Sequence, residues 1–197
     1  MAQAKNTAER ILDAALDSFG TRGYEATSLD DLATQLAIRK QTILYWYPSK
    51  DALLDAVIDR TAAEVTARLE GAVVAAEPGF GRIEAIVRAM SRLAGRYPAM
   101  LGFVRELSRL GPPASTRFTA AIAPLVERAS GYLAVEMDAG RLRRHEPRLL
   151  LLTAYSMVTG LGTEVEVLRL FGEEPSLPSL VRRRDELLNL LRVALEP

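Results

Sequence analysis

Cysteine is absent from this chain of 197 residues, and histidine occurs once, as His145. Without cysteine there are no disulfide bonds and no thiolate-bound metal, a composition that fits the cytoplasm, where we expect the protein to work. His145 lacks neighbouring partners for a metal site or a catalytic triad. The sequence also offers no nucleophile–base pair and no phosphate-binding loop, so we expect no metal, no other cofactor and no enzymatic activity.

Net charge and long apolar runs are lacking as well. The 25 Lys and Arg residues balance the 25 Asp and Glu residues, so the charge of the whole chain predicts neither nucleic acid nor membrane as a partner. Any nucleic-acid contact requires a local patch. The longest uncharged run, residues 149–163, is shorter than a bilayer crossing requires, and we expect no membrane partner.

Helical periodicity extends along nearly the whole chain and predicts an all-α fold of about nine helices. Three short helices come first. An apolar face that ends at Phe19 defines the first helix, and Ser28 is placed to cap the second. The third is expected from about Arg39 to Tyr47, because Pro48 ends it.

A larger helical region follows these three helices. Apolar residues at helical spacing predict a linking helix over residues 49–75. Proline and glycine residues interrupt the periodicity further on and set the limits of five more expected helices, 81–96, 99–110, 114–139, 147–171 and 177–195. We therefore expect two domains, one of three short helices over residues 1–48 and a helical bundle over residues 49–197, which the helix 49–75 links.

The second and third helices, joined by a turn of about three residues, are typical of a helix-turn-helix unit. Ile43 and Tyr47 fall on the inward side of the third helix, and polar residues occupy its opposite side. From Arg39 to Lys50 there are three cations and no acid. This local positive patch, which the net charge conceals, favours contact with nucleic acid.

One stretch resembles the N-terminal DNA-binding domain of the TetR family of transcriptional regulators: ILDAALDSFGTRGYEATSLDDLATQLAIRKQTILYWYPSKDALLDAVI. The likeness covers about residues 9 to 58 with one uninterrupted spacing. Its motif is an apolar helix ending in Phe19, then Gly23-Tyr24, then Thr27-Ser28, and finally aromatic-Pro-Ser-Lys-x-x-Leu-Leu. The resemblance implies a ligand-responsive regulator, most simply a repressor, whose third helix enters the major groove of operator DNA.

The resemblance also implies which residues bind DNA. The start of the third helix would contact base edges and nearby phosphates, the start of the second helix and Lys50 would hold phosphates, and the exposed aromatics would lie against the sugar-phosphate backbone. The set is Thr27, Ser28, Arg39, Lys40, Gln41, Thr42, Tyr45, Trp46 and Lys50. In the alternative, residues 45–47 only seal the junction between the third and fourth helices. We favour this for Tyr47 and not for Tyr45, and for Trp46 both alternatives stay open.

Two residues depart from the family pattern. Ala37 stands where the family usually has glycine, and a positive φ there would cost alanine on the order of 1 kcal/mol. Leu44 stands where the family usually has a phosphate-binding tyrosine. Either Tyr45 takes over that contact or one phosphate contact is lost.

In this family the helical bundle commonly encloses a cavity for a small-molecule inducer. The chain supplies apolar and polarizable side chains that suit an apolar or aromatic ligand. These candidates are Met90, Leu93, Tyr97, Met100, Phe103, Val104, Leu107, Phe118, Ile122, Tyr132 and Tyr155. The alternative for each of them is a place in the ordinary core.

The last two long helices are apolar around more of their circumference than one chain needs to cover, which favours self-association. The resemblance implies a homodimer through these helices, and a two-fold dimer would favour a palindromic operator. A competing hypothesis is an all-α small-ligand-binding protein or enzyme whose N-terminal helix-turn-helix domain, residues 1–48, is not functional in DNA binding. We call this domain the head. Salt-insensitive ligand binding without affinity for duplex DNA would favour it.

Overall fold

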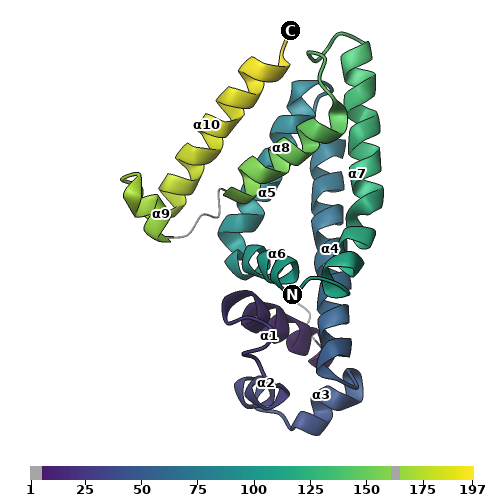
Figure 1. Ribbon diagram of the computed structural model, residues 1–197, viewed down its shortest axis with the longest axis vertical. Helices are drawn as coiled ribbons and strands as arrows, with labels where there is room; N and C mark the ends of the chain where they lie inside the picture. The colour runs from purple at the N-terminus through teal and green to yellow at the C-terminus, as the bar shows by residue number, and fades with distance from the viewer. Residues whose placement is uncertain (1–5, 161–164) are drawn as a thin grey trace. The chain divides into compact units, whose positions relative to one another are not determined.

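The computed structural model describes residues 6–160 and 165–197, which form ten helices and no strand (Figure 1). The predicted all-α fold is confirmed. The helices are α1 Thr7–Thr21, α2 Leu29–Leu36, α3 Lys40–Trp46, α4 Lys50–Val74, α5 Phe80–Arg96, α6 Pro98–Leu110, α7 Ala114–Asp138, α8 Pro147–Gly160, α9 Val165–Leu170 and α10 Leu177–Leu195. The helix expected over 147–171 corresponds to α8 and α9; the residues between them lie outside the described part. In the described ranges no helix is long and apolar enough to cross a membrane.

The chain divides into two compact units. Unit 1 contains the described residues up to 64 together with residues 98–121, and unit 2 contains residues 65–97 together with 122–197. The helices α4 and α7 contribute residues to both units. Helix α6, which we expected in the bundle, is part of unit 1 and packs against α1. The domain boundary at residue 48 remains a prediction.

Unit 1 is built on a core that the apolar faces of its helices share. Ile11 of α1, Leu32 of α2 and Ile43 of α3 are fully buried in this core. Helix α6 supplies Phe103, whose ring stacks on that of Phe19 of α1 with the centroids 6.3 Å apart. Because large aromatic side chains contribute strongly to burial, this contact fastens α6 to the first helix.

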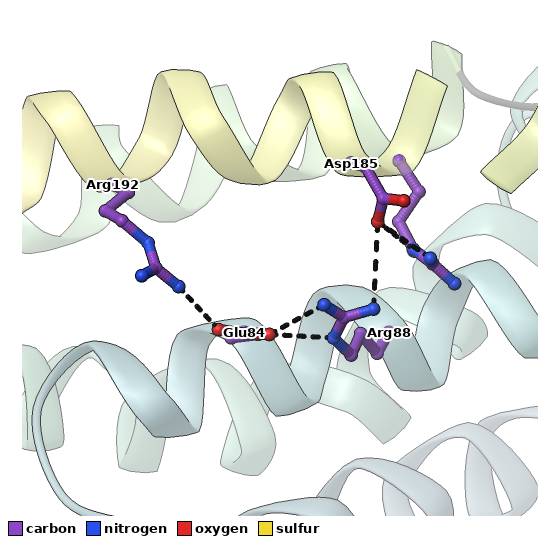
Figure 2. Close-up of polar contacts among 5 residues, drawn as sticks. Glu84, Arg88, Asp185 and Arg192 are labelled. Carbon is purple, nitrogen blue, oxygen red and sulfur yellow. Dashed lines mark hydrogen bonds and ion pairs between the residues drawn. The ribbon is translucent and has the colours of Figure 1, made fainter. Parts of the chain in front are cut away.

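Unit 2 has its own core, in which α10 packs on α5. The apolar side of α10 supplies Leu187, Leu188, Leu191 and Leu195, and α5 contributes Phe80 and Val87. Beside this contact Glu84 of α5 pairs with Arg88 and with Arg192 of α10, both at 2.8 Å (Figure 2). Exposed ion pairs add little to stability, so apolar burial is the main interaction that holds α10 on α5.

A buried carboxylate organises the end of α7. Glu136 is 4% exposed and accepts two hydrogen bonds from Arg141, at 2.6 and 2.7 Å. The paired Arg141 guanidinium holds the pKa of Glu136 below its ordinary value, against the opposing effect of burial. One turn earlier, the Tyr132 hydroxyl accepts a 2.8 Å bond from the backbone N–H of Gly79, which ties α7 to the start of α5.

Candidate nucleic-acid interface

The turn between α2 and α3 depends on one residue in the left-handed conformation. Ala37 ends α2 with φ 54° and ψ 45°, and it is the one non-glycine residue with positive φ in the described ranges. The next amide, that of Ile38, donates to the carbonyl oxygen of Ala33 at 3.0 Å and closes the helix end. The positive φ considered for Ala37 is therefore present, and alanine is strained at this turn.

Helix α3 buries one side and exposes the other. Ile43 is completely buried, whereas Tyr45 is 80% and Trp46 45% exposed. The two exposed rings pack edge-to-face, with their centroids 5.4 Å apart. Arg39 and Gln41 are also exposed, and Thr42 is half-buried. The third helix thus presents polar and aromatic side chains to solvent along the side opposite its core residue, as major-groove recognition requires.

The other aromatic and apolar residues of α3 and its end face the core. Tyr47 is half-buried, packs against the unit 1 core and donates a 3.4 Å bond to the carbonyl oxygen of Ala8. This placement fits the sealing role that we favoured for it. Leu44 is half-buried against the same core. It therefore serves packing, and Tyr45 is the exposed phenol nearest to it in sequence.

An acid that the sequence pattern did not reveal lies on this surface. Asp30, in the first turn of α2, accepts a hydrogen bond from the Lys40 ammonium group at 2.8 Å, and both side chains are substantially exposed. With three cations and no acid between residues 39 and 50, the sequence predicts a local positive patch. The fold places the charge of Asp30 against one of these cations and weakens the local positive potential.

Thr27 and Ser28, the two hydroxyl residues before α2, differ in burial. Thr27 is 1% exposed, and its hydroxyl donates to the carbonyl oxygen of Gly23 at 2.9 Å. The Thr27 hydroxyl is therefore buried and its hydrogen is used within the fold, and a phosphate contact at Thr27 stays a prediction. Ser28 is exposed and caps α2 by accepting from the backbone N–H of Asp31 at 3.0 Å.

Lys50 opens α4 and lies over an aromatic ring. Its ammonium nitrogen is 4.0 Å from the ring centroid of Tyr24, a cation–π contact. The Tyr24 hydroxyl donates a hydrogen bond to Asp51, the next residue of α4. Burial, and then this bond to Asp51, raise the pKa of Tyr24 well above its ordinary value, so the phenol stays protonated. Sequence reasoning identified Lys50 but not the role of Tyr24 beside it.

The eleven candidate effector-binding residues fall in both units. Unit 1 holds Met100, Phe103, Val104, Leu107 and Phe118, and unit 2 holds Met90, Leu93, Tyr97, Ile122, Tyr132 and Tyr155. Phe103 and Leu107 belong to the unit 1 core, which agrees with the ordinary-core alternative for these two residues. Tyr155 is half exposed. That the set lines one ligand cavity remains a prediction.

A helical fold with a helix-turn-helix head and an exposed third helix defines a class of DNA-binding regulators. Residues 11–57 match the family described as bacterial regulatory proteins, tetR family. The N-terminal part of the chain is therefore similar to the TetR family, as its motif predicted.

Relatives and solved structures similar to this chain cover more of its length. The regulator RutR of Escherichia coli K12 is 29% identical over 145 residues, which cover 72% of this chain and 66% of RutR, just under two thirds of that relative. The repressor KstR of Mycobacterium tuberculosis is 28% identical over 47% of this chain and 42% of its own length. AibR, solved with isovaleryl coenzyme A and operator DNA, shares the fold with a TM-score of 0.79 at 16% identity, over 94% of this chain and 97% of AibR.

Proposed function

We propose that this protein is a transcriptional repressor that binds palindromic operator DNA as a homodimer and leaves it when a small molecule binds. The observation that carries the proposal is that α3 has one buried and one exposed face: Ile43 is buried, whereas Tyr45 and the polar residues of the helix are exposed. A regulator of this class acts on the chromosome, and we therefore assign it to the cytoplasm.

The contacts to DNA follow from exposure and chemistry. Arg39, Lys40, Gln41 and Thr42, at the N-terminal end of α3, face base edges and nearby phosphates. Ser28, at the N-terminus of α2, and Lys50, at the start of α4, bind phosphates. The rings of Tyr45 and Trp46 lie against the sugar-phosphate backbone.

Selection from a library of random duplexes, followed by binding titrations at several salt concentrations, tests DNA recognition. Gln41→Ala should cost roughly 1–3 kcal/mol at one base pair and relax the preference there. Lys50→Ala should weaken binding about equally for every sequence. If no duplex is selected at modest salt, the proposal is contradicted. If both variants lose the same affinity on every operator, the base-contacting residues are misassigned.

The dimer is proposed on apolar side chains that α8 and α10 leave exposed. Both helices pack on α5 within unit 2, yet large side chains on each face solvent in the single chain. These are Leu149, Leu152, Tyr155 and Met157 on α8, and Leu177, Val181, Leu190 and Val193 on α10. A second copy covering them buries this surface, and a two-fold axis would present two heads about 34–36 Å apart for successive major grooves.

Light scattering and sedimentation on point variants test the dimer. Leu152→Glu and Leu190→Glu place a charge within the proposed interface and should shift the protein toward monomer. Val135→Glu, at a 61% exposed position on α7, is the matched control and should leave the dimer intact. A wild-type monomer at micromolar concentration, or dimers in both interface variants, would contradict this assembly.

The effector is proposed to be a small organic molecule with apolar or aromatic character. Structures that share the fold were solved with choline and with stearoyl-CoA, at TM-scores of 0.77 and 0.75 and identities of 20% and 17%. A thermal-shift screen with acyl-CoA thioesters, quaternary amines and aromatic acids should yield a compound that raises Tm, because a ligand that binds the folded state stabilises it. The same compound should release operator DNA; a binder without effect on DNA would separate ligand binding from regulation.

A further inference from the structure

Tyr24 lies between α6 and the start of α4, within unit 1. It follows the turn residue Gly23, which has φ 92°, and it is 8% exposed. Its ring packs edge-on against that of Phe19, with the centroids 5.2 Å apart. The side chain and its backbone amide therefore have fixed surroundings, and their contacts on either side identify what Tyr24 connects.

On one side, Tyr24 is held by a carboxylate of α6. Its backbone N–H donates to Oε1 of Glu106 at 2.7 Å, and Glu106 is only 9% exposed. The Arg109 guanidinium donates to both carboxylate oxygens of Glu106, each at 2.7 Å, and fixes their orientation. Because charge-assisted hydrogen bonds are short and directional, α6 sets where the Tyr24 backbone lies.

On the other side, the ring of Tyr24 supports the residue that we assign to a DNA phosphate. The Lys50 ammonium nitrogen lies 4.0 Å from the ring centroid, and the Tyr24 hydroxyl donates to Asp51. A lysine side chain has several rotatable bonds, and holding it in one place lowers the entropy that it loses on binding a phosphate. The ring attracts the cation without satisfying its three N–H donors, which remain available to a phosphate.

We infer that Tyr24 is a positioning residue: it holds Lys50 for an operator phosphate, and Glu106 of α6 holds Tyr24. The inference rests on the proposed function and extends it by naming the link between α6 and a DNA contact. A change in the position of α6 would act on operator affinity through this link.

A double-mutant cycle with full-length protein and a selected operator tests the inference. Tyr24→Leu removes the ring and should weaken binding by about 2–5-fold per protomer, the range of an exposed cation–π contact. In the Lys50→Ala background the same change should have no further effect. Tyr24→Phe keeps the ring and should stay near the wild-type affinity.

The second arm of the cycle addresses α6. Glu106→Ala should weaken operator binding, and Glu106→Gln, which keeps an oxygen for the Tyr24 amide, should recover most of the loss. Both effects should vanish in the Lys50→Ala background. Circular dichroism measures the folded fraction of each variant, and the operator affinity is calculated for the folded protein only. A variant that merely folds poorly then shows no coupling with Lys50 in the double-mutant cycle.

The outcomes separate the inference from the function beneath it. Equal losses for Tyr24→Leu with and without Lys50 overturn the inference while operator binding stands. If the wild-type protein selects no duplex, the proposed function fails and the inference fails with it. If DNA binds but Lys50→Ala leaves the salt dependence unchanged, Lys50 touches no phosphate and the inference is overturned, because each lost phosphate contact lowers the slope by about 0.9.

Discussion

The backbones of Gly20 in α1 and Gly102 in α6 meet without a side chain between them. A methyl group built on Gly102 would lie 2.1 Å from the carbonyl oxygen of Gly20, and one on Gly20 would lie 2.0 Å from the carbonyl oxygen of Ala99. Both distances are far below van der Waals contact and involve backbone atoms, which cannot rotate away. The contact between the first helix of the head and α6 therefore depends on glycine at both positions.

Gly20→Ala or Gly102→Ala should separate α1 from α6 and destabilise the protein by about 1–3 kcal/mol or more, the usual effect of overpacking. Urea unfolding followed by circular dichroism measures the change. Gly71→Ala is the matched control, because Gly71 lies in α4 with no atom within 4 Å of the added methyl group. This control should be neutral or stabilising by up to about 1 kcal/mol, and a similar loss for all three variants would contradict the argument.

Ala37→Gly should stabilise the protein by about 1 kcal/mol, because glycine adopts the left-handed conformation without the Cβ penalty that alanine has at φ 54°. The free energy of unfolding in urea checks the sign. Ala63→Gly, at an exposed position with helical backbone in α4, should instead destabilise by about 1 kcal/mol. Destabilisation by both changes would show that the turn does not strain Ala37.

Much of the head could be predicted because its signals are local. Ser28 caps α2, Gly23 has a positive φ after α1, and Pro48 follows α3, all within a few residues of the element that they limit. The strain at Ala37 followed from the position of a family glycine.

Contacts between distant residues could not be predicted in this way. Tyr24 and Glu106 are 82 positions apart, and no periodic pattern in either helix indicates their hydrogen bond. Thr27 and Ser28 have nearly the same chemistry, and only the path of the chain after Gly23 buries one and exposes the other. Burial and charge pairing at the site follow from packing, which local sequence does not specify.

The Glu136–Arg141 pair predicts an acid-sensitive contribution to stability. The pKa of Glu136 is lowered in the folded protein, chiefly by its hydrogen bonds to Arg141. Its stabilisation is therefore complete above the ordinary Glu pKa of 4.5 and is lost as the pH falls through the lower folded value. The difference in unfolding free energy between wild type and Glu136→Gln should be constant above about pH 5 and shrink below pH 4.5.

A second variant checks that the pair is the cause. Arg141→Met leaves the buried carboxylate without its donor and should destabilise the protein at neutral pH more than Glu136→Gln does. Its deficit should decrease in acid, where Glu136 takes up a proton. A difference between wild type and Glu136→Gln that grows as the pH falls would contradict the assignment.

The pairing of Lys40 with Asp30 predicts a variant with higher affinity for DNA. Asp30 holds the Lys40 ammonium group at 2.8 Å and also repels phosphates, so Asp30→Asn should tighten binding by about 2–5-fold per protomer, the range of an exposed ion pair. The gain should be larger at low salt, where charges are less screened. Because the freed cation attracts any duplex, the affinity for non-specific DNA should rise at least as much as the affinity for the operator. The ratio of operator affinity to non-specific affinity should therefore fall or stay unchanged.

Asp31→Asn separates this ion pair from a general effect of charge. Asp31 is the next residue along α2, and its carboxylate accepts hydrogen bonds from Ser28 instead of from Lys40. Asparagine keeps an acceptor oxygen for this capping interaction, so the variant removes one negative charge from the same helix turn without freeing a cation. If Asp31→Asn raised affinity as much as Asp30→Asn, the gain would come from net charge alone. A larger gain for Asp30→Asn, abolished by adding Lys40→Ala, would assign it to the released ammonium group.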